Sequence, residues 1–124
     1  MLTRFENLTF IETPGANASA AVATASTGAK DVSVIRQRQQ PGGFNPLHTH
    51  DVEEVMLLLS GELEVTTGDT THTLRAGDSL ILPPGISHQL ANRSDIVAEW
   101  LIVALAGVKF FHTNGEQGIP PWSL

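Results

Sequence analysis

The sequence contains no cysteine among its 124 residues. Disulfides, a thiolate nucleophile and a cysteine-based zinc site are therefore excluded. Basic residues are also few: 7 Lys and Arg stand against 13 Asp and Glu, and the net charge is −6. Because no basic cluster is available to neutralise phosphates, we expect no nucleic-acid partner. Any metal site must be built from His, Asp and Glu.

The chain also lacks a long hydrophobic run. The longest mainly apolar stretch, residues 96–108, contains Glu99 and is too short to span a bilayer. The first residues place no apolar segment behind a basic one, so we expect no secretory signal. These absences predict a cytoplasmic protein without a membrane partner. The length, with 41% hydrophobic and 16% charged residues, is typical of one globular domain over residues 1–124.

Short apolar blocks broken by Gly, Pro and Asp run through the sequence, and no helical periodicity appears. This pattern predicts an all-β domain. Turn signals such as Ser60-Gly61 and Ala76-Gly77-Asp78 separate the blocks. Many short strands at this spacing indicate a sandwich or a barrel. The strands are expected near residues 18–25, 31–39, 46–50, 54–60, 62–67, 71–75, 79–82, 87–92 and 96–105.

The segment His48-Thr49-His50 carries the strongest chemical signal. In a strand, residues i and i+2 project from the same face, so both imidazoles point one way. Glu54 shares this parity if the intervening bend preserves the alternation, and His88 follows the rigid turn at residues 83–85. Three neutral imidazoles and one carboxylate suit a borderline divalent metal ion. An isolated His-x-His pair is more often a surface feature, so the surrounding residues decide between the two interpretations.

Those surroundings resemble the two signature motifs of the cupin superfamily at every fixed position. The first motif reads G-x5-H-x-H-x3-E-x6-G and the second G-x5-P-x-G-x2-H-x3-N. Together they cover residues 42–92. The glycines, the proline and the asparagine are expected to shape turns and hold backbone rather than to contact a substrate. The matching residues are Gly42, His48, His50, Glu54 and Gly61 in the first motif, and Gly77, Pro83, Gly85, His88 and Asn92 in the second.

The resemblance implies an all-β fold, a double-stranded jelly-roll β-barrel. The barrel would span about residues 31–106, between an N-terminal arm over residues 1–30 and a C-terminal arm over residues 107–124. Family members of this size commonly form homodimers that exchange N-terminal strands, and we expect a homodimer here. The expected interior residues are Met56, Leu58, Val65, Leu80, Leu82, Leu90, Ile102 and Ala104.

The resemblance also implies one divalent metal ion per chain, held by His48, His50, Glu54 and His88. Iron or manganese is favoured, and zinc, nickel, cobalt and copper are the alternatives. Four protein ligands on an octahedral ion leave two positions for a small-molecule substrate, dioxygen or water.

We therefore favour a metal-dependent oxidoreductase, a dioxygenase that acts on a small oxygenated organic molecule. Glu54 is also the candidate catalytic residue, as the group that moves a proton. The alternatives are a metal-dependent isomerase or lyase, a non-catalytic module that binds or senses a small molecule, and a purely structural metal.

Three residues are candidates for lining the substrate pocket: Phe44, Met56 and Trp100. Phe44 precedes the ligand histidines and could instead seal a dimer contact. Trp100 lies in an apolar strand, where a place in the core is the alternative.

Four polar residues alternate along one expected strand, with Arg36 and Arg38 on one face and Gln37 and Gln39 on the other. We expect the arginines to cover the outside, because charged side chains are mostly exposed. His72, in a hairpin, and His112, beyond the barrel, match no motif position. Both are expected to be solvated rather than to bind metal.

Overall fold

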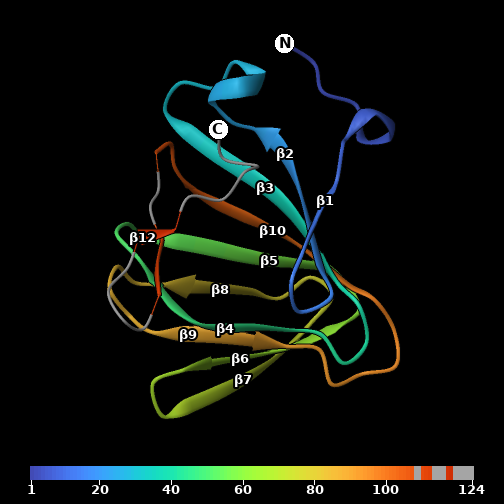
Figure 1. The fold of residues 1–124 in the computed structure, drawn as a ribbon, viewed down its shortest axis with the longest axis vertical. Helices are drawn as coiled ribbons and strands as arrows, with labels where there is room; N and C mark the ends of the chain where they lie inside the picture. The colour runs from blue at the N-terminus through green and yellow to red at the C-terminus, as the bar shows by residue number, and fades with distance from the viewer. Residues whose placement is uncertain (108–109, 113–116, 119–124) are drawn as a thin grey trace.

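The computed structural model describes residues 1–107, 110–112 and 117–118 (Figure 1). These residues form twelve strands and two single-turn 3₁₀ helices, η1 (Phe5–Asn7) and η2 (Ala25–Thr27). All strand pairings are antiparallel. The all-β prediction is confirmed. Within these residues, no helix is long and apolar enough to cross a membrane.

The first sheet has six strands in the order β1-β2-β3-β10-β5-β8. Its longest pairing joins β3 and β10 over eight residues, so segments that are distant in the sequence lie side by side (Figure 1). The strands of this sheet are β1 (Ile11–Thr13), β2 (Asn17–Ala23), β3 (Val32–Gln39), β5 (Glu54–Ser60), β8 (Ser79–Leu82) and β10 (Ala98–Leu105).

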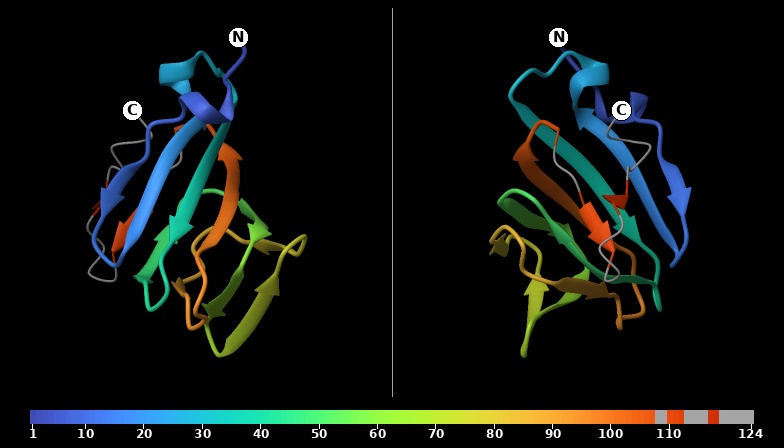
Figure 2. Two further views of the ribbon diagram at one scale, coloured as in Figure 1. Left: turned by 90° about the vertical axis from the view of Figure 1, so that its right-hand side faces the viewer. Right: turned by 60° about the vertical axis from the view of Figure 1, so that its left-hand side comes forward.

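The second sheet also has six strands, in the order β12-β11-β4-β9-β6-β7. Its strands are β4 (Phe44–His50), β6 (Glu62–Thr67), β7 (Thr70–Arg75), β9 (His88–Ala91), β11 (Phe110–His112) and β12 (Gln117–Gly118). The two sheets form the two layers of the molecule (Figure 2).

The hydrophobic core lies between the sheets. Inward residues alternate with outward ones along β5 and β6, as a strand with one buried face requires. Ile102 and Leu80 pack against the core and are partly buried, and the other six expected interior residues are buried. The core cluster comprises Met56, Leu58, Leu63, Val65, Leu74, Leu82, Leu90, Ala98 and Trp100.

Gly61 turns the chain from β5, in the first sheet, into β6, in the second. Its φ is +82°, in the left-handed region that favours glycine. A Cβ atom at this position would lie 2.4 Å from the carbonyl oxygen of Val97. The motif glycine is therefore required both by the backbone conformation and by the close approach of the strand that follows Val97.

Three observed strands were not expected from the sequence: β1, β11 and β12. Each has only two or three residues, too few to show an alternation, and is defined by its partner strand rather than by its own pattern. β1 and β2 extend the first sheet from the segment expected as an N-terminal arm, and β2 pairs with β3 of the same chain. β11 pairs with β4, so the segment after residue 107 contributes to the second sheet.

Candidate metal centre

Three histidines converge at one end of the second sheet. His48 and His50 lie near the end of β4, two residues apart and on one face, and His88 opens the neighbouring strand β9, in register with His48. The ring centroids lie 4.2 Å apart for His48 and His88, 5.0 Å for His48 and His50, and 5.1 Å for His50 and His88. One nitrogen of each ring lies within 4.8 Å of the others, so the cluster could hold a metal ion.

The turn at Pro83, Pro84 and Gly85 places His88 against β4. Gly85 has a φ of +76°, and its backbone N–H donates a hydrogen bond of 2.9 Å to the carbonyl of His50. The turn is therefore attached directly to a residue of the cluster. The proline and glycine residues that form the turn therefore also determine where His88 lies.

Backbone carbonyls orient two of the rings. The Nδ1 of His48 lies 2.8 Å from the carbonyl oxygen of Pro46, and the Nδ1 of His88 lies 3.1 Å from that of Ile86. In each case the partner is two residues earlier and can only accept, so Nδ1 carries the proton and donates. This tautomer leaves the Nε2 lone pair available to a metal ion, as is usual for metal-binding histidines.

Burial also keeps these rings neutral. Burial, with a smaller effect of the neighbouring His88, lowers the pKa of the His48 imidazole from 6.5 to about 4. Burial likewise lowers the pKa of His88 below its ordinary value. Because only the neutral imidazole binds a metal ion, both rings are in the binding form at neutral pH.

Glu54 reaches the cluster from the opposite sheet. It opens β5, its side chain is 2% exposed, and its Oε2 lies 3.0 Å from the Nδ1 of His50. Oε2 accepts no hydrogen bond from a described residue. A buried carboxylate oxygen needs a compensating partner, and a divalent cation held with the histidines would supply one.

The donor set therefore fits a divalent cation, since it offers imidazole nitrogens and a buried carboxylate oxygen. The nitrogens of the three histidines lie close to one another, and Glu54 lies close to one of them, His50. Glu54 as the fourth ligand, and the identity of the ion, stay predictions.

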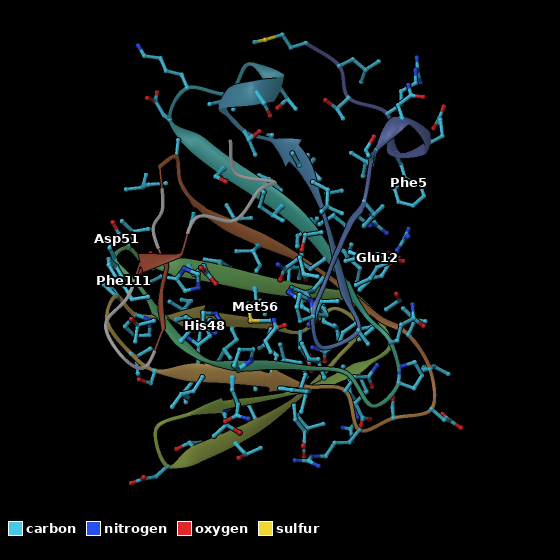
Figure 3. The ribbon with its side chains drawn as sticks, in the orientation of Figure 1. Phe5, Glu12, His48, Asp51, Met56 and Phe111 are labelled. Atoms are coloured by element: carbon cyan, nitrogen blue, oxygen red, sulfur yellow. The ribbon has the colours of Figure 1, made fainter. Side chains whose placement is uncertain are left out.

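The candidate pocket residues lie at different depths. Met56 is one inward position beyond Glu54 on β5 and belongs to the core (Figure 3). Trp100 is fully buried, and its Nε1 donates to the Oε1 of Gln37 at 3.0 Å. Phe44 lies at the beginning of β4, at the other end of the strand from His50, and is 52% exposed. The structure thus does not bring Phe44 to the cluster.

Sequence reasoning missed two polar residues that lie in the strand rows of Glu54 and His88. Ser33 and Glu54 flank Ala104 in one row across β3, β10 and β5, and Ser33 is 6% exposed. Thr67 is in register with His88 on the neighbouring strand β6. Neither carries a sequence signal, because each is brought to the site by strand pairing between distant segments.

Two histidines were expected away from the site. His72 lies on the edge strand β7, opposite Val65, and is partly exposed. The expectation that His112 lies beyond the barrel is wrong: β11 places its backbone opposite His48 in the second sheet. The side chain of His112 lies outside the described part of the chain, so the expectation that it is solvated stays a prediction.

Asn92 and the arginines behave as expected. The Nδ2 of Asn92 donates to the carbonyls of Gln39, at 3.0 Å, and Ile96, at 2.8 Å, so this side chain holds backbone together. Arg36 and Arg38 form ion pairs with Glu99 on the outward face of the first sheet.

A family model described as "Cupin domain" matches residues 35–104, which include all four expected ligands. Germin-like protein 5-1 of Oryza sativa subsp. japonica is 40% identical to this chain over 73 residues, which are 54% of this chain and 33% of that protein. The chain thus spans about a third of the length of the first curated relatives it matches.

Solved structures share the fold at lower identity. A structure described as a sugar phosphate isomerase from Silicibacter pomeroyi has a TM-score of 0.76 at 21% identity and covers 92% of this chain and 82% of its own. A predicted oxalate decarboxylase from Thermotoga maritima has a TM-score of 0.75 at 23% identity, with 85% of this chain and 98% of its own covered. The jelly-roll fold is confirmed.

Proposed function

Since the chain belongs to the cupin domain family, we propose that it is a metal-dependent enzyme that acts on a small oxygenated organic molecule. Among the reactions open to such a site, a dioxygenase-type oxidation is the one we favour, with iron or manganese as the ion. Nitrogen and oxygen donors without thiolate suit these metals, as they suit zinc, nickel, cobalt and copper.

One observation carries this proposal. His48, His50 and His88 each offer a nitrogen within 4.8 Å of the others, and Glu54 Oε2, buried 3.0 Å from the Nδ1 of His50, accepts no hydrogen bond from a described residue. A buried, unsatisfied carboxylate costs stability unless a cation or a proton compensates it. A carboxylate that is kept in the interior despite this loss of stability is expected to have a function, such as binding a cation or a proton.

The residues of the chain have distinct tasks in this proposal. The carbonyls of Pro46 and Ile86 hold His48 and His88 in the tautomer that presents Nε2. A divalent ion bound there would polarise a substrate oxygen and provide positions for substrate and dioxygen.

Glu54 would hold the ion or accept a proton from the substrate at Oε2, the atom that lies 3.0 Å from His50. Apolar neighbours such as Met56 and Leu82 would keep water away from this carboxylate.

The test combines metal analysis with oxygen uptake. Protein purified without an affinity tag and reconstituted anaerobically with Fe(II) or Mn(II) should bind about one ion per chain. It should then consume oxygen with at least one member of a panel of small enolic and hydroxy acids. The His48→Ala/His50→Ala variant should lose both properties, with metal affinity reduced at least about 100-fold. His72→Ala is the matched control and should retain both.

Each alternative gives a different result in the same experiment. Full metal occupancy in the double variant would show that the site lies elsewhere. Metal binding without oxygen uptake, but with a substrate that is cleaved or rearranged, would replace the dioxygenase with a lyase or an isomerase. A ligand that is retained unchanged would indicate a binding or sensing module.

A further inference from the structure

The inward face of the first sheet becomes apolar one step along the strands from Glu54. The row that contains Glu54 carries a second polar group, the hydroxyl of Ser33 on β3. Successive inward rows of a sheet lie about 6.6 Å apart along the strands. The next inward row, which we call the apolar row, consists of Ile35, Ile102, Met56 and Leu80.

The second sheet shows the same change beside the histidines. Leu90 follows His88 by two residues on β9, so both side chains project from the same face. Val65 on β6 is in register with Leu90, and these two residues are 0% and 2% exposed. Both sheets therefore place hydrocarbon one inward step from the residues that offer donor atoms to a metal ion.

Ile102 gives the apolar row a surface that a ligand can contact. Its strand β10 lies between β3 and β5, and its neighbours in the row, Ile35 and Met56, are 5% and 1% exposed. Ile102 itself packs against the core but is only partly buried. An inward side chain with a strand on either side can be accessible only from the interior. The accessible surface of Ile102 therefore faces the space between the sheets.

Strand β3 offers charge on one face and a neutral donor on the other. Arg36 and Arg38 pair with Glu99 on the outward face. Burial raises the pKa of the Glu99 carboxyl, but hydrogen bonds from the two arginines outweigh burial and leave the pKa below its ordinary value. Glu99 is therefore ionised and compensates the arginines. The inward face offers Ser33, 6% exposed, whose hydroxyl can donate a hydrogen bond to a ligand oxygen.

We infer that the substrate of this site has one chelating pair of oxygens with at most one negative charge, and an otherwise apolar body, and that Ile102 and Ser33 select it. This inference rests on the proposed function. The chelating oxygens would take the open positions on the ion. The apolar body would contact Ile102, and the Ser33 hydroxyl would donate to an oxygen of the substrate.

The apolar row distinguishes between classes of small oxygenated molecules. About 60 Å² of apolar surface buried against it is worth about tenfold in affinity. A second carboxylate or a phosphate placed against the same hydrocarbon would lose its hydration without gaining a partner. Monoanionic enolates and hydroxyketones with hydrocarbon bodies are therefore favoured over small dicarboxylates and phosphorylated sugars.

The test measures binding rather than turnover. The full chain is reconstituted anaerobically with Mn(II) and titrated by calorimetry with tropolone and with oxalate. Both probes chelate through two oxygens, but tropolone has one negative charge and a hydrocarbon ring, whereas oxalate has two charges and no hydrocarbon. The ratio of tropolone affinity to oxalate affinity should be at least about tenfold higher on the protein than for Mn(II) free in the same buffer.

Two neighbouring residues of β10 provide matched variants. Ile102→Thr replaces inward hydrocarbon by a hydroxyl and should remove most of this preference, while Mn(II) stoichiometry and the circular dichroism spectrum stay unchanged. Val103→Thr makes a similar change at the next position, which faces outward and is also partly buried, and should keep the preference. Ser33→Ala should lower the tropolone affinity about threefold to tenfold. It decides the test if Ile102→Thr does not fold.

A wild-type ratio equal to that of free Mn(II) would overturn this inference and leave the metal enzyme in place. So would a preference that Ile102→Thr and Ser33→Ala leave unchanged, or that Val103→Thr lowers as much as Ile102→Thr does. A chain that binds no Mn(II) would instead remove the proposed function, and the inferred substrate with it. Selective tropolone binding without oxygen uptake on any substrate would support the inferred class and contradict only the dioxygenase reaction.

Discussion

At the residue scale, the centre depends on a few polar atoms that backbone groups orient. His48 and His88 each donate Nδ1–H to the carbonyl two residues earlier, which fixes the tautomer without a second side chain. Local chain geometry therefore supplies the orienting partner that many metal-binding histidines take from a carboxylate. Glu54 differs, because its position depends on the other sheet.

The lowered pKa of His48 predicts acid sensitivity of the metal-free protein. Its pKa is about 4 when folded and 6.5 in its ordinary state, so the unfolded chain binds the proton more tightly. The contribution is fully present above pH 6.5 and is lost as the pH falls from 6.5 toward 4, at no more than about 1.4 kcal/mol per pH unit. Urea unfolding of the apoprotein should show this loss, and His48→Asn should reduce its slope. An unchanged slope would contradict the assignment.

At the element scale, the turns between strands position the residues of the site. The hydrogen bond from Gly85 N–H to the His50 carbonyl fastens the 83–85 turn to β4. Asn92 fastens the loops at the other end of β9 through Gln39 and Ile96. The spacing between Gly85, His88 and Asn92 in the motif therefore matches the length of chain between these hydrogen bonds.

Two turn glycines provide a matched test of this view. Gly61 and Gly68 both have positive φ, at +82° and +56°, but only at Gly61 would a Cβ collide with backbone, whereas nothing lies within 4 Å of it at Gly68. Gly68→Ala should cost about 1 kcal/mol from backbone conformation alone. Gly61→Ala should cost roughly 2 kcal/mol more, since the Val97 segment must move. If chemical denaturation gave equal losses of unfolding free energy for the two variants, the close approach of Val97 to Gly61 would contribute nothing to the difference.

At the scale of the whole molecule, a centre that included Glu54 would join the two sheets. The histidines come from β4 and β9, and Glu54 comes from β5 across the core. An ion held by both layers would bind the folded chain and not the unfolded one, so it would stabilise the sandwich by mass action.

Metal should therefore raise the melting temperature. Free ion at 100 times its dissociation constant should add about 2.7 kcal/mol, or roughly 10 °C for a domain of this size. Glu54→Gln should keep the fold and reduce the increment, because the link to the first sheet is weakened. Calorimetry with and without a chelator measures both. The same increment in Glu54→Gln would show that the histidines bind the ion alone.

Strand alternation and turn residues predicted nine strands and the core, because these features depend on neighbours within a few positions, and the resemblance to the cupin motifs pointed to the three histidines. The residues Met56, Leu58 and Leu90 were assigned to the interior for that reason, and they are buried. Strands β1 and β11 could not be predicted, since three residues carry no pattern. The same limit applies to Ser33 and Thr67.

The sequence by itself determined the chemistry of this protein: no thiolate, a net negative charge, and imidazoles and a carboxylate at motif spacing. Only the tertiary structure decided which groups meet. Pairing of β4 with β9 sets His48 beside His88, and packing of the two sheets brings Glu54 to His50. Pairing of β10 with β5 also placed Ile102 beside Met56, one inward row from Glu54. Contacts between distant segments decide these features, because each depends on strand register and not on the local preferences of either segment.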